Sequence, residues 1–493
     1  MAGRIAILYF VVFSALAAAD RPNIVFAIAD DWGWPHASIY GNDKVCQTPT
    51  FDAIARNGIL FHHAYISSPS CTPSRNAILT GQYHWRLGGG GNLWSVLDTR
   101  HQTYPHLLED KGYFTGSWRK SWGPGNASNW KRYPSGKRFK NPEAFLDEWR
   151  EKDEENPFCF WFGASDPHRG YKLHSGRESG MNLSEIQLFK HYPDSPEIRG
   201  DVADYYFEVQ RFDRELGQFL ARLKALKVLE NTIVVVTGDH GMPFPRCKSN
   251  LYDSGARVPL AIQWPKVIKR GRVVDDFVST TDLAPTFLEA AGLAPLEAMT
   301  GRSLMPIFRD PGSGRIQPGI RDHVIMGKER HVLAQEAPDT GGTPMRAIRT
   351  YDHLFIRNFR PDRWPAGTPN HKIATIPGAW LADCDNGPTK THMVDNRDKN
   401  EEYRMKYDLS FSKRPALELY DLRKDPDQLH NIADSPESSE VLNQLKDTLE
   451  RALKATHDPR VLGKGAEAFD RPKYLGGAPK FPAVRKNRKK RSQ

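Results

Sequence analysis

The stretch NIVFAIADD, residues 23–31, decides the fold of this chain, because its apolar run ends abruptly in two acidic residues. Asn23–Ala29 is short and continuously apolar, which is the pattern of a strand buried on both faces of a parallel sheet. A second such run, Thr232–Thr237 (TIVVVT), is rich in β-branched residues and is followed, after one glycine, by Asp239 and His240. Two strands of this kind predict an α/β protein with a parallel sheet at its centre.

Segments with the signals of helices and strands alternate along the first 325 residues. The clearest helix is Asp201–Leu226, in which apolar residues recur at spacings of three and four. Thr48-Pro49 begins another helix, which ends near Asn57-Gly58. Further predicted elements are helices at Tyr104–Lys111 and Asp282–Ala291 and strands at Phe158–Ala164 and Leu260–Trp264. We therefore expect residues 20–325 to form the catalytic domain, built on a large mixed, mostly parallel sheet flanked by helices.

The pattern changes beyond about residue 325. The predicted elements there are three short strands and a helix: Met345–Thr350, His353–Asn358, Leu417–Leu422 and Ser435–Thr456. Strands followed by a helix predict a smaller C-terminal α+β domain, an antiparallel sheet plus a helix, over residues 326–462. Residues 463–493 are rich in Gly, Pro and Lys and end in a basic run, which predicts a flexible surface tail.

Residues 1–19 have the features of a secretory signal peptide. A positive charge at Arg4 precedes the apolar run Ile5–Ala15, and Ala17–Ala19 fits a small-residue cleavage site. An uncleaved membrane anchor is the alternative, although the run is short for a bilayer span. No other stretch approaches about 18 consecutive apolar residues, so we expect no stable membrane association of the mature protein. The predicted destination is secreted or periplasmic, or lysosomal in a eukaryote.

The composition is that of a globular enzyme. The 493 residues are 39% hydrophobic and 11% aromatic, which is enough for a sizeable core and argues against wholesale disorder. Lys and Arg exceed Asp and Glu by 69 to 59, but part of this excess lies in the terminal basic run, so the charge is weak support for an anionic substrate. We expect no nucleic-acid partner. The five cysteines fit no zinc-binding spacing.

Acidic pairs follow both central strands. Asp30-Asp31 and Asp239-His240 should converge, because ligands of parallel sheets bind beyond the carboxyl ends of the strands. Three carboxylates in one place repel one another unless a cation neutralises them, and oxygen ligands suit calcium or magnesium. Taken separately, each pair has another interpretation, as solvated loop acids or helix N-caps.

The most specific motif is Cys71–Gly81 (CTPSRNAILTG). It resembles the signature of type I sulfatases, Cys-x-Pro-Ser-Arg followed by Leu-Thr-Gly. The resemblance implies an alkaline-phosphatase-like fold, a calcium ion, and oxidation of Cys71 to formylglycine by a formylglycine-generating or sulfatase-maturing enzyme. The implied metal ligands are Asp30, Asp31, Cys71, Asp239 and His240. With Cys71 reserved for chemistry, the other four cysteines have three possible disulfide pairings or stay free.

Other segments extend the resemblance over roughly residues 21–457. They are Tyr113–Lys120, Asp166–His168, Lys248–Pro259 and Glu418–Ala433. The resemblance implies that Lys120, Lys248 and His168 hold the sulfate oxygens and that His168 or Lys248 protonates the leaving group. Arg75 lies one turn after Cys71 if that cysteine opens a helix, where it can orient the nucleophile and help neutralise the acidic pocket.

Trp122 departs from the family's pattern. The family usually reads Gly-Lys-Trp-His after the threonine, whereas residues 119–122 read Arg-Lys-Ser-Trp. The missing histidine commonly bonds the second hydroxyl of the nucleophile, and an indole can donate a hydrogen bond but accepts no proton. His84 and His101 are candidate replacements, although a lone histidine is more often structural.

Segments Asp166–Gly170 (DPHRG), Trp122–Gly125 (WGPG) and Arg363–Gly367 most resemble the heparan N-sulfatase branch. We therefore expect a secreted sulfatase that hydrolyses a sulfate ester or sulfamate of a sulfated carbohydrate, with heparan-type N-sulfoglucosamine favoured. The alternatives are a phosphonate or phosphodiester hydrolase on the same scaffold and an inactive polyanion-binding homologue. The cluster Glu329-Arg330-His331 is a candidate to reach over the pocket and bind sugar hydroxyls or carboxylates. The alternative interpretation is a surface cluster at the end of a strand.

Overall fold

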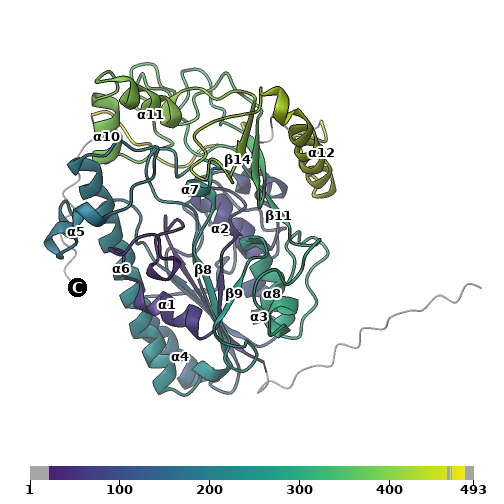
Figure 1. Ribbon diagram of the computed structural model, residues 1–493. Coiled ribbons are helices and arrows are strands. Elements are labelled where there is room, and N and C mark those ends of the chain that lie inside the picture. Colours follow the sequence, from purple (N-terminus) through teal and green to yellow (C-terminus); the bar gives the residue numbers. More distant parts are fainter. Residues whose placement is uncertain (1–20, 464–466, 468, 483–493) are drawn as a thin grey trace, which may run out of the picture.

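The computed structural model describes residues 21–463, 467 and 469–482 (Figure 1). The predicted signal peptide, residues 1–19, and the basic run that begins at Arg485 lie outside the described residues. Within the described part of the chain, no helix combines the length and apolar character that a membrane span requires.

An eight-stranded sheet forms the centre of the molecule, in the order β5-β4-β6-β1-β7-β8-β2-β9. β1 pairs in parallel with β6 on one side and with β7 on the other, and only β8 runs antiparallel to its neighbours. The prediction of a mixed, mostly parallel sheet is confirmed. In chain order the strands are β1 Asn23–Ala29, β2 Ile59–Phe61, β4 Phe114–Arg119, β5 Lys137–Phe139, β6 Phe158–Gly163, β7 Thr232–Gly238, β8 Leu260–Gln263 and β9 Arg272–Val274.

Helices cover both faces of this sheet (Figure 1). Alternate residues of β1 point to opposite sides: Phe26 packs with α2, α3 and α8, whereas Val25 packs with α1, α4 and α6. The continuous apolar run in the sequence is therefore explained by burial on both faces. These helices are α1 Pro49–Arg56, α2 Cys71–Thr80, α3 Tyr104–Glu109, α4 Pro142–Asp153, α6 Pro196–Ala225 and α8 Leu283–Ala290.

The C-terminal part contains a second, antiparallel sheet, in the order β11-β12-β13-β14. Helix α12, Ser439–Ala455, packs Leu445, Leu449 and Leu453 against it, so the predicted α+β arrangement is confirmed. β11 starts at His323, and the predicted domain boundary at residue 326 therefore falls inside a strand that the sequence did not predict. The strands are β11 His323–Lys328, β12 Met345–Thr350, β13 His353–Asn358 and β14 Leu417–Asp421.

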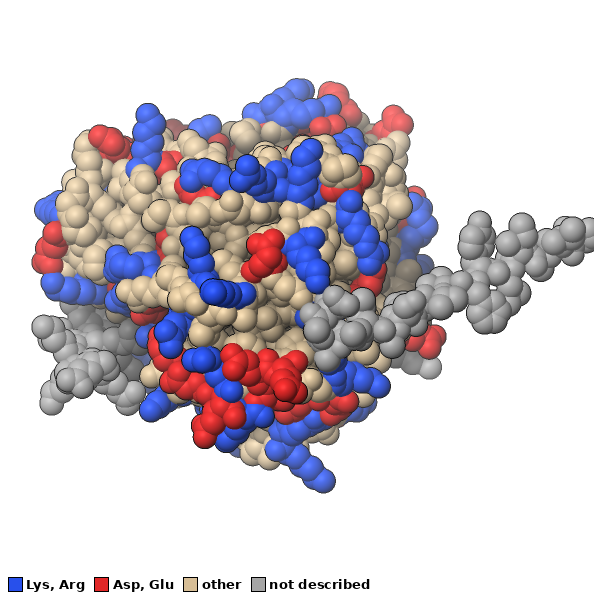
Figure 2. All heavy atoms as spheres, turned by 90° about the horizontal axis from the view of Figure 1, so that it is seen from below, with Lys and Arg blue, Asp and Glu red and all other residues tan. Residues whose placement is uncertain are grey.

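Smaller elements complete the fold. Helix α6 begins five residues earlier than predicted, because Ser195 caps its N-terminus and Pro196 takes the first helical position. The remaining elements are α5 Ser175–Glu178, α7 Asp253–Ala256, α9 Met305–Arg309, α10 Pro388–Asp395, α11 Glu401–Phe411 and a two-stranded sheet of β3 Ala64–Tyr65 with β10 Val278–Ser279. The face seen from below carries interspersed basic and acidic side chains, with acidic groups gathered in the lower part of the view (Figure 2).

Part of the predicted surface tail is instead packed against the protein. Phe469 is fully buried beside α12, and its carbonyl oxygen accepts a hydrogen bond of 2.8 Å from Asn92 Nδ2. Lys480 forms a β-bridge with Ala379. Phe469 and Lys480 thus contact the folded protein within the segment expected to be a flexible surface tail, because a composition rich in Gly, Pro and Lys does not reveal its buried aromatic side chain.

We expect Phe469→Ala to lower the free energy of unfolding by about 3 kcal/mol, the cost of emptying a buried aromatic site. Urea denaturation followed by circular dichroism measures this. The matched control is Leu462→Ala, since Leu462 is about half exposed and the change should cost under about 0.5 kcal/mol. Equal effects of the two substitutions would contradict the packing described here.

Candidate active site

Four polar side chains meet at the carboxyl ends of β1 and β7. The register pairs Ala29 with Gly238, which places the residues that follow side by side. The backbone N–H of Asp31 donates to Asp239 Oδ1 at 2.8 Å. His240 Nε2 lies 3.1 Å from Asp31 Oδ1. The predicted convergence of the two acidic pairs is confirmed, and all of these groups are buried.

Cys71 opens α2, and its thiol lies against this cluster. Its Sγ is 3.2 Å from His240 Nε2, 3.7 Å from Asp30 Oδ1 and 3.9 Å from Asp31 Oδ1. Burial raises the pKa of the Cys71 thiol above its ordinary value. The unmodified thiol is therefore held protonated, which is a poor state for a nucleophile.

Arg75 lies one turn beyond Cys71 on α2 and is fully buried. Its Nε donates to Asp239 Oδ2 at 2.8 Å, and Nη2 lies 3.5 Å from Asp30 Oδ1. Nη1 donates to the carbonyl oxygen of Lys120 at 2.6 Å. The guanidinium thus ties the acids of both strand ends to the segment after β4.

Two lysines reach the same cluster from other elements. Lys120 Nζ contacts both oxygens of Asp30, at 2.5 and 2.6 Å. Lys248 Nζ donates to Asp31 Oδ2 at 2.9 Å and to Asp385 Oδ2 at 2.8 Å. Burial lowers the pKa of Lys120, but Asp30, Cys71 and Asp239 together outweigh burial and leave that pKa above the ordinary value. The pKa of Lys248 is raised in the same way, chiefly by Asp31 and Asp385 against its burial. Both lysines are therefore charged at neutral pH.

His168 lies at the outer side of the cluster, in the segment after β6. Its Nε2 is 3.9 Å from Asp31 Oδ2, and its side chain is 37% exposed. Asp166 fixes this segment, because its carbonyl oxygen accepts from Asp30 N at 2.9 Å and its carboxylate binds Arg211 through two contacts of 2.6 Å. All five predicted catalytic residues, Cys71, Arg75, Lys120, His168 and Lys248, therefore lie in one place.

The same cluster contains the donor atoms that a metal ion requires. Ligand atoms of Asp31, Cys71 and His240 all lie within 4.8 Å of one another, as do those of Asp30, Cys71 and Asp239. A third group joins Asp31 and His168 to Asp385. The first two groups share Cys71 and are rich in carboxylate oxygen, which suits a hard cation such as calcium.

Trp122 does not take the place of the family's histidine. Its indole Nε1 donates to Asn76 Oδ1 at 2.6 Å, and its ring packs in the core between the sheet and α2. His84 is fully buried, with Nδ1 2.9 Å from Ser67 Oγ. Among the described contacts, neither His84 nor His101 reaches Cys71.

Of the residues around Cys71, sequence reasoning missed Asp385 and anticipated His331 only as part of a three-residue cluster. Asp385 comes from the loop before α10, and no local motif marks it. His331 Nδ1 lies 2.7 Å from Ser70 Oγ, next to Cys71. Within the predicted Glu329-Arg330-His331 cluster only the histidine reaches the site. Glu329 binds Arg346 and Arg460, and the Arg330 guanidinium binds backbone carbonyls of residues 340, 470 and 472.

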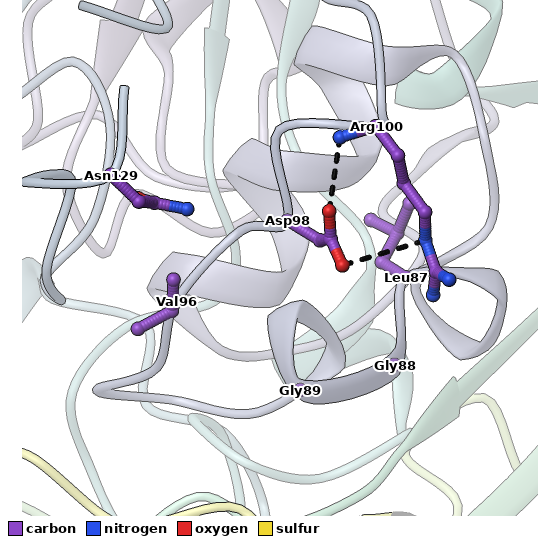
Figure 3. A pocket seen from close by; sticks show the side chains of 7 residues that line it. All are labelled: Leu87, Gly88, Gly89, Val96, Asp98, Arg100 and Asn129. Atoms are coloured by element: carbon purple, nitrogen blue, oxygen red, sulfur yellow. Dashed lines mark hydrogen bonds and ion pairs between the residues drawn. The ribbon is translucent and has the colours of Figure 1, made fainter. Parts of the chain in front are cut away.

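A separate hollow of about 340 Å³ lies on the surface. Figure 3 shows its lining, in which Asp98 and Arg100 form an ion pair of 3.6 Å beside Gly88 and Gly89. None of the predicted catalytic or metal-binding residues lines it. The candidate active site is therefore the buried cluster around Cys71.

Comparisons with known proteins identify the class. The sulfatase family model matches residues 22–293, which is more than half of the chain, and the chain belongs to the sulfatase family. It is an enzyme of the sulfuric ester hydrolase class with the alkaline-phosphatase-like fold.

Particular relatives cover nearly the whole chain. An ulvan-active sulfatase of Formosa agariphila is 28% identical, covering 96% of this chain and 89% of the relative. Human N-sulphoglucosamine sulphohydrolase is also 28% identical, covering 90% of this chain and 92% of the relative. The solved structure of BT4656 with its substrate D-glucosamine-2-N,6-O-disulfate has a TM-score of 0.59 at 20% identity, covering 89% of this chain and 98% of that one.

We expect Arg75→Ala to destabilise the fold by about 3–5 kcal/mol, because it leaves the buried Asp239 carboxylate without its guanidinium partner and removes one of the two cations beside Asp30. Chemical denaturation with a chelator present measures the effect without interference from added metal. Arg100→Ala is the control, since Arg100 is 69% exposed and pairs only at the surface. A loss below about 1 kcal/mol for Arg75→Ala would refute this account of the charge balance.

Proposed function

We propose that this sulfatase is a secreted enzyme that removes a sulfate group from a carbohydrate, with heparan-type N-sulfoglucosamine the favoured substrate. One observation carries the proposal: Cys71 lies at the start of α2 against the acids of both strand ends, with Lys120 and Lys248 beside them. The names of the relatives support the substrate class, since they act on ulvan and on N-sulphoglucosamine.

Residue 71 would act as formylglycine, made from the cysteine by a maturation enzyme. Hydration of its aldehyde would give a geminal diol, one hydroxyl of which would attack sulfur. The buried, protonated thiol of Cys71 supports this requirement, because without oxidation the residue offers only a weak nucleophile. Arg75 would orient the residue from one turn along α2.

Asp30, Asp31, Asp239 and His240 would hold one calcium ion together with residue 71. Bound there, the ion would polarise the attacking oxygen and screen the negative charge of the sulfate group. The contacts of the carboxylates support this role. Lys120 and Lys248 pair with Asp30 and Asp31, and a bound calcium ion would neutralise these carboxylates and leave the lysines to bind sulfate.

The terminal oxygens of the sulfate group would be bound by Lys120, Lys248 and His168. Both lysines are charged and close to Cys71, and charge-assisted hydrogen bonds of this type stabilise the negative charge of the reacting group. His168 is the most exposed of the set, so it is well placed to hand a proton to the leaving group at the pocket mouth.

We expect Cys71→Ser to lose sustained turnover of sulfated sugars, by roughly a thousand-fold or more, as for removal of other enzymic nucleophiles. Steady-state assays on a panel of sulfated monosaccharides and a phosphodiester measure this, and mass spectrometry of the wild-type peptide tests for the mass loss of thiol-to-aldehyde conversion. Cys159→Ala, in β6, is the control that keeps activity. Normal turnover by Cys71→Ser, or selective cleavage of the phosphodiester, would end the proposal.

Calcium at a hundred times its dissociation constant should stabilise the fold by about 2.7 kcal/mol, because only the folded state assembles the ligands. A rise in melting temperature after calcium is added to chelated protein reports this independently of activity. Asp31→Asn should abolish the rise, whereas Asp362→Asn, at a surface ion pair with Arg360, should retain it. An unchanged melting temperature in wild type would argue against a calcium site.

A further inference from the structure

Three polar side chains define the mouth of the active site. Lys120, His168 and Asp385 are 19%, 37% and 21% exposed, whereas Asp30, Asp31, Asp239 and Arg75 are at most 2% exposed. Lys120 and His168 are among the predicted sulfate ligands, whereas Asp385 is a carboxylate. A substrate that enters must therefore meet Asp385 together with the groups that bind its sulfate.

Asp385 lies close to Lys248 and to His168. Its Oδ2 accepts from Lys248 Nζ at 2.8 Å, and ligand atoms of Asp31, His168 and Asp385 all lie within 4.8 Å of one another. Lys248 already has a carboxylate partner in Asp31 at 2.9 Å. Neutralising Lys248 therefore does not require a second acid.

The loop that carries Asp385 is held in place from within. Lys390 Nζ is buried and donates to the carbonyl oxygens of Trp380, Leu381 and Cys384, at 2.8, 3.0 and 2.9 Å, and to Asn386 Oδ1 at 2.9 Å. These contacts hold the loop together from its buried side and fix the position of the Asp385 carboxylate.

A second set of contacts anchors the same loop to the rest of the site. Asp383 Oδ2 accepts from Lys328 Nζ at 2.7 Å and from Ser249 Oγ at 3.2 Å, and Asp383 Oδ1 accepts from Val332 N at 2.9 Å. Asp385 is therefore a preorganised group and not a mobile surface acid.

A carboxylate at this place repels sulfate oxygens, and its partner Lys248 is shared with Asp31, so a hydrogen-bond donor or a positive charge on the substrate would balance the remaining negative charge. Sulfamates and sulfate esters differ in this respect. The bridging nitrogen of a sulfamate carries a hydrogen, whereas the bridging oxygen of an ester carries none. A fixed acceptor beside the sulfate ligands thus distinguishes the two.

We propose that Asp385 accepts a hydrogen bond from the bridging N–H of a sulfamate and makes this enzyme selective for N-sulfate over O-sulfate. The overall reaction is R–NH–SO₃⁻ + H₂O → R–NH₃⁺ + SO₄²⁻: the S–N bond breaks, one S–O bond forms, and nitrogen gains two protons. Positive charge develops on that nitrogen, next to the Asp385 carboxylate, as His168 protonates it. An ester instead releases a neutral alcohol, which gains nothing from the carboxylate. The inference rests on the proposed sulfatase function and deepens it.

The test compares two substrates with one difference, glucosamine N-sulfate and glucose 2-O-sulfate. In wild type, kcat/KM should favour the N-sulfate. Asp385→Asn removes the negative charge but keeps an oxygen that accepts a hydrogen bond. It should therefore lower kcat/KM for the N-sulfate about ten-fold more than for the O-sulfate, the difference between a hydrogen bond to a charged group and one to a neutral group. Asp362→Asn is the matched control and should change neither value. Thermal melting checks that Asp385→Asn folds like wild type.

An equal fall on both substrates, or no fall on the N-sulfate, would overturn the selectivity role, as would a wild type that prefers the ester. Each of these outcomes leaves the sulfatase function intact. If wild type cleaves neither sugar, the proposed carbohydrate substrate fails instead. Calorimetric titration then tests Asp385 without turnover: a preference for glucosamine over glucose that Asp385→Asn abolishes supports the role, and its absence in wild type rejects it.

Discussion

The structure depends on keeping three carboxylates apart from water at the ends of two adjacent strands. Asp30, Asp31 and Asp239 are almost fully buried, and isolated buried charges of one sign carry a prohibitive solvation cost. This solvation cost is offset by ion pairs that the carboxylates form with Arg75, Lys120 and Lys248. Because each cation comes from a different part of the chain, satisfying these acids also determines how α2, the segment after β4 and the segment after β7 are joined.

The second part of the chain completes the pocket that the central sheet begins. His331 follows β11 and contacts Ser70, while Asp385 and Asp383 precede α10 and contact Lys248 and Ser249. The segment 469–482 then packs over the loop before α10, through the bridge between Lys480 and Ala379. The carboxyl edge of the sheet is thus enclosed by residues that lie hundreds of positions away in sequence.

Local sequence patterns were enough to predict the elements whose structure depends on burial alone. The apolar run Asn23–Ala29 could only be a strand buried on both faces, and the acids that follow such strands in a parallel sheet converge by geometry. Cys71, Lys120, His168 and Lys248 could be placed by motif resemblance.

The remaining residues could not be predicted, because long-range contacts position them. Nothing near Asp385 in sequence marks it as part of the site; its place depends on the contacts of Lys390 and Asp383. Phe469 lay in a segment whose composition suggested a tail. The substitution at Trp122 was visible, but only the structure shows that Asn76 occupies its indole N–H.

The ammonium of Lys390 has a further consequence. Fully buried and with four oxygen partners, it fills the role that a bound metal ion has in other loops, but it is part of the chain. Asp385, which we propose reads the leaving group, therefore lies on a loop that has its own internal anchor and that contacts the reacting groups through Lys248. Substitutions within the loop should change which substrates are preferred while the reacting groups stay in place. This loop is therefore a suitable target for engineering new sulfatase specificities.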